Sequence, residues 1–113
     1  MTDSSTICAI STPPGTGGIA VLRLSGEQAF SIANAVFTPR QKGKQLSGSP
    51  ANTLHVGTVT AGSELIDEVV ISLFRAPHSF TGEDVVEISC HGAVYIQQRL
   101  LQLLIEKGAR LAW

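Results

Sequence analysis

The chain has 113 residues, of which 43% are hydrophobic and 15% charged, and its formal net charge is -1. This length and composition predict one globular domain and leave no room for a second catalytic domain. Eight basic residues against nine acidic ones exclude an unaided electrostatic grip on nucleic acid or anionic lipid.

No apolar run approaches the roughly 18 residues that a membrane span needs, and residues 1–5 lack the form of a signal peptide. We therefore expect a cytoplasmic protein without a membrane partner. The two cysteines, Cys8 and Cys90, are too few for a disulfide framework, and we expect both to be reduced and packed.

Two strands are predicted at the N-terminus. Residues 6–10 are short, apolar and β-branched, and residues 19–24 alternate so that Arg23 shares a face with Ile19 and Val21. Between them, residues 11–18 are rich in proline and glycine, which predicts an irregular loop.

A first helix is predicted to begin at Ser25, which with Gln28 has the form of a capping box. Pro39 is expected to end it, and residues 38–52 are expected to form a long surface loop. The apolar positions at helical spacing are Ala29, Ile32, Ala33, Val36 and Phe37.

The next segments predict more strands. Residues 53–60 and 65–74 are β-rich runs around a short glycine-containing turn, which indicates an antiparallel hairpin. Residues 84–90 predict a further strand.

The strongest helix prediction covers residues 92–107, with Gly108 as its stop and a short strand from residue 110. The order of elements predicts an α+β fold, a mixed β-sheet with two main helices mainly on one face. The apolar stripe of this helix comprises Ala93, Ile96, Leu100, Leu103 and Leu104, widened by Leu101 and Ile105.

The loop at residues 13–18 lacks the lysine and hydroxyl residue of a phosphate-binding loop. It is interpreted as a rigid turn that lets backbone approach closely, with ligand contact as the alternative.

Metal ligation is not expected, because His55, His78, His91 and Cys90 lack paired spacing. Cys90 and His91 should point to opposite faces of a strand, so they do not form a nucleophile and base. We interpret them as strand-end packing and helix entry.

Glu87 stands in the middle of an apolar strand. It is either solvated, or paired with Arg23 in a salt bridge, or a fork that accepts two parallel N–H donors from a flat heterocycle. Arg23 is correspondingly an ion-pair partner or a clamp for an anionic group.

Two acidic pairs have simpler interpretations. Asp67 and Glu68 are expected to be a solvated strand start, and Glu83 and Asp84 to bond local backbone at a turn.

Several segments together resemble the N-terminal domain of the MnmE family of tRNA modification GTPases, also called TrmE. The resemblance covers almost the whole chain and is carried by TPPG at 12–15, GGI at 17–19, LRLSG at 22–26, APHSFTGEDVVE at 76–87 and HG at 91–92.

In that family the domain is similar to the tetrahydrofolate-binding fold of folate-dependent aminomethyltransferases. The resemblance implies that it binds 5-formyl- or 5,10-methylene-tetrahydrofolate and builds a homodimer. Glu87 matches the family's pterin-recognising glutamate and Arg23 its folate-contacting arginine, while Gly15, Gly17 and Gly18 would line the pocket.

The resemblance also implies a parent protein with helical and GTP-binding domains outside residues 1–113, the latter with magnesium and potassium sites. With its partner MnmG (GidA), the parent attaches an aminomethyl or carboxymethylaminomethyl group at C5 of the tRNA wobble uridine. This single domain is then not expected to hydrolyse GTP alone, and tRNA contact should come mainly from other parts.

The alternative is a dimerisation module without active folate binding, in which Glu87 and Arg23 only pair with each other. Two residues depart from the family pattern: Thr16 replaces a common arginine, and Ala93 replaces a second glycine. The family also continues past Trp113 to a further folate-contacting lysine.

Overall fold

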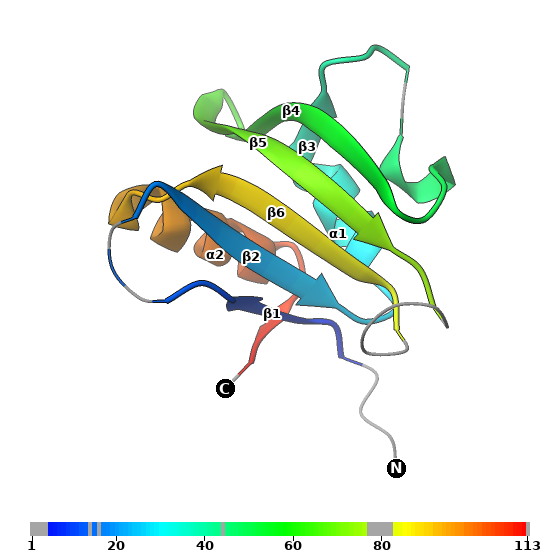
Figure 1. Cartoon of the computed structure of the whole chain (residues 1–113), viewed down its shortest axis with the longest axis horizontal. Helices are drawn as coiled ribbons and strands as arrows, with labels where there is room; N and C mark the ends of the chain where they lie inside the picture. The colour runs from blue at the N-terminus through cyan, green and yellow to red at the C-terminus, as the bar shows by residue number, and fades with distance from the viewer. Residues whose placement is uncertain (1–4, 14, 16, 44, 77–82, 113) are drawn as a thin grey trace.

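A computed structural model describes residues 5–13, 15, 17–43, 45–76 and 83–112. It contains one seven-stranded sheet in the order β3-β4-β5-β6-β2-β1-β7 (Figure 1). The elements are β1 Ile7–Ile10, β2 Ile19–Ser25, α1 Ala29–Val36, β3 Phe37–Pro39, the 3-10 helix η1 Leu46–Gly48, β4 Thr53–Ala61, β5 Glu64–Phe74, β6 Val85–His91, α2 Val94–Glu106 and β7 Arg110–Leu111.

Both α-helices pack on the same face of the sheet, and no described helix covers the other face (Figure 1). Alternation along each strand explains the layers, because Ala20, Leu22 and Leu24 of β2 are buried while the intervening residues are not. The predicted α+β fold with a mixed sheet and two helices is confirmed.

The pairing of strands is antiparallel except at one edge. Strands β4 and β5 form the predicted hairpin, with a bulge between Val59 and Thr60. The central strands β2 and β6 pair over their whole length, and β7 runs parallel to β1. The sheet is therefore mixed, as expected.

The predicted capping box at Ser25 is wrong. Ser25 is the last residue of β2, and its Oγ lies 3.5 Å from Glu83 Oε2, while α1 begins at Ala29 without a side-chain cap. The entry to the helix is instead bonded from the neighbouring segment, since Thr6 Oγ1 accepts the Gln28 N–H at 2.9 Å. The hydrogen bond at the start of α1 thus comes from a residue distant in sequence, Thr6, and not from the predicted capping box.

The prediction of a long surface loop over residues 38–52 is also wrong in part. Residues 37–39 form the edge strand β3, where Pro39 is tolerated because an edge leaves one side of the strand unpaired. Leu46 of η1 is fully buried, and its N–H donates to Asn34 Oδ1 at 3.2 Å. Arg75 holds the same segment, donating to Ser49 O at 2.6 Å.

Helix α2 matches the prediction in its centre and at its end. Leu100, Leu103 and Leu104 are buried, and Gly108 ends the helix with φ +117°, a conformation that favours glycine. Ala93 and Ile105, which were expected in the apolar stripe, are exposed. Ala93 lies before the first turn, and the stripe is narrower than its sequence spacing indicated.

Candidate functional site on the open sheet face

The uncovered face carries an ion pair at the centre of the sheet. Arg23 of β2 and Glu87 of β6 lie directly opposite each other in register. Arg23 Nε and Nη2 both donate to Glu87 Oε2, at 3.0 and 2.5 Å. The salt bridge that was one interpretation of these residues is therefore formed.

This pair does not use all the capacity of the carboxylate. Among the described residues, Glu87 Oε1 accepts no hydrogen bond, and a carboxylate offers about four lone-pair sites. The side chains are 39% and 24% exposed for Arg23 and Glu87. Both side chains are thus partly accessible to a molecule that lies on this face.

The glycine-rich loop is held against the start of α2. Gly17 N–H donates to Gly92 O and Gly92 N–H donates to Gly18 O, both at 3.2 Å. A side chain at position 92 could not fit, because its Cβ would overlap the carbonyl oxygen of Gly17. The expected close backbone approach exists, and its partner is the β6–α2 junction.

Gln97 of α2, which sequence reasoning missed, completes this contact. It is 4% exposed, and its Nε2 donates to Gly15 O at 3.1 Å and to Gly92 O at 2.9 Å. The sequence did carry a signal for Gln97: it is a polar residue four positions after Ala93, so it lies on the predicted apolar side of the helix. Gln97 therefore fixes the loop to the helix.

The loop and Gln97 line a hollow of about 200 Å³ together with Thr12, Pro13 and Ile19. Arg23 is four residues beyond Ile19 along β2, roughly 13 Å at the rise of a β-strand. Neither Arg23 nor Glu87 lines this hollow. The role of Gly15, Gly17 and Gly18 in one pocket with that pair stays a prediction.

The expectation that Asp67 begins a solvated strand is wrong. Its carboxylate is 8% exposed, and Oδ2 accepts the backbone N–H of His91 at 2.8 Å while Oδ1 lies 2.7 Å from His91 Nδ1. The two residues come from β5 and β6, and only the folded sheet brings them together. Glu68, next in sequence, is exposed as expected.

Cys90 and His91 point to opposite sides of β6, as predicted. The Cys90 side lies in the core, and the His91 side chain is 70% exposed. Burial raises the pKa of the Cys90 thiol to about 11, with a second contribution from the charge of Asp67. Burial also raises the pKa of Cys8, and both cysteines are free thiols.

The structure describes some of the other candidate residues and not the rest. His55 is buried in β4, with Nε2 2.8 Å from Thr53 Oγ1. Asp84 accepts the N–H of Ala76 through Oδ1 at 3.0 Å, so the backbone group that it bonds lies eight positions earlier in the chain and not in the same turn. Pro14, Thr16, His78, residues 80–82 and Trp113 lie outside the described residues.

Within the described ranges, no three histidine, cysteine or acidic side chains gather where they could hold a metal ion. Neither described helix is long and apolar enough to cross a membrane.

These features define a class of protein: a small α+β domain that keeps both helices on one side of its sheet and presents a charged pair on the other. The family described as the N-terminus of the GTP-binding protein TrmE matches residues 6–113. The chain belongs to this family.

Curated relatives agree, and each carries the name tRNA modification GTPase MnmE. The chain is 58% identical to the Parabacteroides distasonis protein over 96% of its own length, and 53% identical to the Enterococcus faecalis protein over 95%. It is 48% identical to the Flavobacterium johnsoniae protein over 99%. The chain spans 24%, 23% and 24% of those three relatives, about a quarter of their length.

Proposed function

We propose that this chain is the folate-binding and homodimerising domain of a tRNA modification GTPase. In this proposal it holds 5-formyl- or 5,10-methylene-tetrahydrofolate, the one-carbon donor, in a fold like that of the folate-dependent aminomethyltransferases. The observation that carries the proposal is the Arg23–Glu87 pair on the uncovered face, with Glu87 Oε1 left without a described partner.

The residues fit a pterin edge with one adjustment. A pterin presents its N3–H and 2-amino group as two parallel donors, which need one lone pair from each carboxylate oxygen. Oε1 of Glu87 is available, whereas Oε2 accepts two bonds from Arg23. Because Arg23 is 39% exposed, it can release one of these bonds and turn toward an anionic part of the ligand.

The whole-protein part of the proposal rests on family membership. The parent protein binds and hydrolyses GTP with magnesium and potassium in domains outside this chain. Together with MnmG (GidA) it modifies C5 of the tRNA wobble uridine in the cytoplasm. The net charge of -1 supports a minor share in tRNA contact for this domain.

A calorimetric titration with 5-formyltetrahydrofolate tests folate binding. Replacing Glu87 with Gln should weaken binding by roughly 1–3 kcal/mol, because an amide offers a donor where two acceptors are needed. Arg23→Ala should weaken binding too. Glu106→Gln, an equivalent change on an exposed residue of α2, is the control and should bind as the unchanged chain does.

The fold should survive Glu87→Gln, since partly exposed ion pairs contribute about 0–1 kcal/mol, and thermal unfolding checks this. Equal affinity in the Gln variant would remove Glu87 from the proposed site.

The second candidate function is a dimerisation module without folate binding. It is favoured by the exposure of Ile19, Leu54 and Val56 on the open face, at 70%, 68% and 41%, and by the bonding of Arg23 to Glu87 itself. Light scattering alongside the titration separates the two functions, because a folded dimer that binds no folate supports only this one.

A further inference from the structure

Charge is unevenly distributed along the chain. Residues 28–63, which include α1, β3, η1 and β4, contain no aspartate or glutamate. Their basic side chains are Arg40, Lys42 and Lys44, an excess of three positive charges. The rest of the chain has five basic and nine acidic side chains, an excess of four negative charges. The formal net charge of -1 is therefore an average over a basic segment and an acidic remainder.

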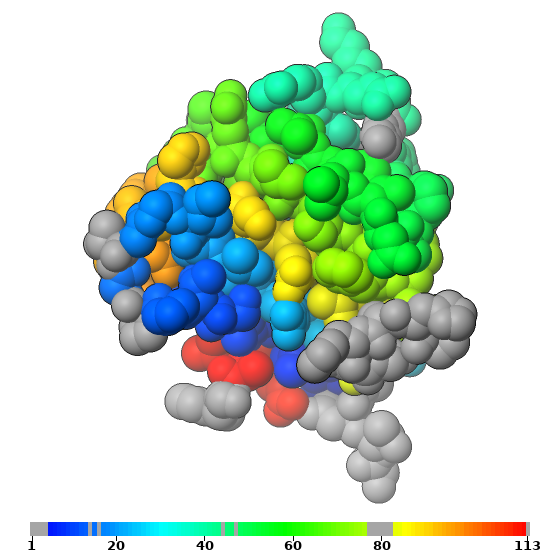
Figure 2. Space-filling view, in the orientation of Figure 1, coloured from blue at the N-terminus to red at the C-terminus, as the bar shows by residue number. Residues whose placement is uncertain are grey.

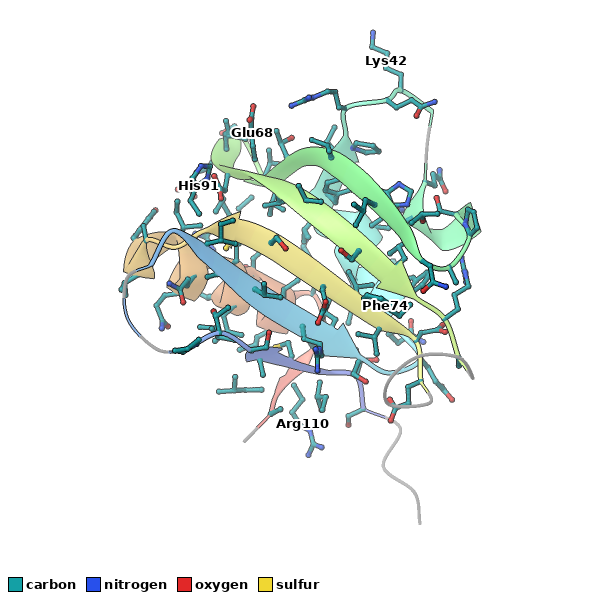
Figure 3. All side chains as sticks on the ribbon, in the orientation of Figure 1. Lys42, Glu68, Phe74, His91 and Arg110 are labelled. Atoms are coloured by element: carbon teal, nitrogen blue, oxygen red, sulfur yellow. The ribbon has the colours of Figure 1, made fainter. Side chains whose placement is uncertain are left out.

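The basic residues follow the edge strand β3. The backbone N–H of Arg40 donates to Val56 O at 2.9 Å, so the pairing of β3 with β4 continues to Arg40. Arg40 and Lys42 are both exposed, and neither joins a salt bridge within the described ranges. Figure 2 shows the turquoise segment around residue 40 projecting at one edge of the molecule. Figure 3 shows Lys42 pointing away from the sheet.

The fold supplies little negative charge to this edge. Thr38 of β3 is in register with Thr58 of β4, and Thr58 with Glu68 of β5. Glu68 is thus two strand spacings from β3, roughly 10 Å, which exceeds the Debye length of about 8 Å at physiological salt.

A hollow of about 340 Å³ adjoins Arg40, and no acidic side chain lines it. Its lining residues are Pro39, Arg40, Gln41, Leu54, His55 and Val56. The positive charges at this edge are therefore available to an anionic partner from outside the domain.

The chemistry of these residues favours phosphate. An arginine side chain binds phosphate through two parallel N–H donors, and a lysine binds it as a point charge. Neutralising the phosphates of a nucleic acid also releases counterions, which favours binding at low salt. No phenylalanine, tyrosine or tryptophan lines the hollow, so stacking of RNA bases is not indicated. The expected contact is with the sugar–phosphate backbone and is independent of base sequence.

We propose that Arg40, Lys42 and Lys44, the basic edge, bind the phosphates of the tRNA substrate. Lys44 enters from its place in the sequence, since it lies outside the described residues. The inference rests on the proposed function, which supplies a tRNA as substrate, and it gives a location to this domain's minor share of tRNA contact. The basic edge is also at the opposite side of the sheet from β7.

The test measures binding of a fluorescein-labelled tRNA transcript, with uridine at its wobble position, by anisotropy at several salt concentrations. The variant Arg40→Gln/Lys42→Gln removes two charges from the basic edge. The matched control is Lys107→Gln/Arg110→Gln, which removes two charges from exposed residues at the end of α2 and in β7. Both variants have the same net charge, so only the location of the lost charges differs. Thermal unfolding checks each fold.

We expect Arg40→Gln/Lys42→Gln to weaken tRNA binding at least about tenfold at low salt. The slope of log binding constant against log salt should become shallower by about two, one for each lost phosphate contact. The control should keep the slope of the unchanged chain. Lys42→Gln alone, at an exposed residue, should make the slope shallower by about one.

Three results would overturn the proposal: no tRNA binding by the unchanged chain at low salt, equal loss of binding in the control, or an unchanged slope in Arg40→Gln/Lys42→Gln. Displacement of the tRNA by poly-L-glutamate as readily as by unlabelled tRNA, at equal concentrations of charge, would overturn it too, since the partner would then be an acidic polypeptide. Titration of the same variants with 5-formyltetrahydrofolate keeps the two proposals apart. Folate affinity should not change in Arg40→Gln/Lys42→Gln, and absence of folate binding in every protein would count against the proposed function alone.

Discussion

Folding makes the thiol of Cys90 harder to ionise. Its pKa is about 11 in the folded chain, through burial and then the charge of Asp67, against 9.0 for an ordinary thiol. Between these values the unfolded chain loses the proton and the folded chain keeps it. The folded state then binds more protons, so the free energy of unfolding should fall as pH rises from about 9 to about 11.

Denaturant unfolding across this pH range, compared between the unchanged chain and Cys90→Ala, isolates the effect from other groups that titrate there. The difference in stability between the two proteins should shrink as pH rises. Parallel decline of both proteins would contradict the assignment to Cys90.

At the scale of elements, η1 depends on one buried leucine. Leu46 has no exposed surface and belongs to the core that α1 shares with the sheet. Replacing it with Ala should lower the free energy of unfolding by about 2–5 kcal/mol, since it removes buried apolar atoms and leaves a cavity. Leu54→Ala is the matched control, because Leu54 is 68% exposed.

Chemical denaturation of both variants measures the two changes. If Leu46→Ala lowers the free energy of unfolding no more than Leu54→Ala does, then η1 does not anchor the segment before β4.

The elements that sequence reasoning predicted well are those with their own periodicity. Strand β2 alternates buried Leu22 and Leu24 with partly exposed residues, and α2 repeats leucine at helical spacing, so each reveals its buried side locally. Strand β3 and η1 have too few residues to show a period, and β3 exists because β4 offers hydrogen bonds to it.

The same distinction applies to the candidate sites. Arg23 and Glu87 could be found because each is a charge within an apolar strand, although their register was not visible. The partner of His91 is Asp67, 24 positions earlier, and that of Thr6 is Gln28, 22 positions later. Nothing local encodes either contact, because both arise only when separate segments meet.

For the whole molecule, the open face sets the expected mode of self-association. If a second copy covers it, Leu54→Asp would bury an unpaired charge in the interface and weaken dimerisation at least about tenfold. Leu65→Asp is the control, because this leucine is 60% exposed at the hairpin turn. Sedimentation over a range of concentrations measures both variants, and unchanged association of Leu54→Asp would place the interface elsewhere.

The parallel pairing of β7 with β1 has a consequence for synthesis in the cell. Arg110 N–H donates to Thr6 O, and Ala112 N–H donates to Cys8 O, both at 2.8 Å. At typical translation speeds, about 5–20 s separate the emergence of these two strands from the ribosome. Throughout that interval β7 cannot pair with β1, so the nascent domain exposes the backbone donors and acceptors on the outer edge of β1, where another strand can pair with them.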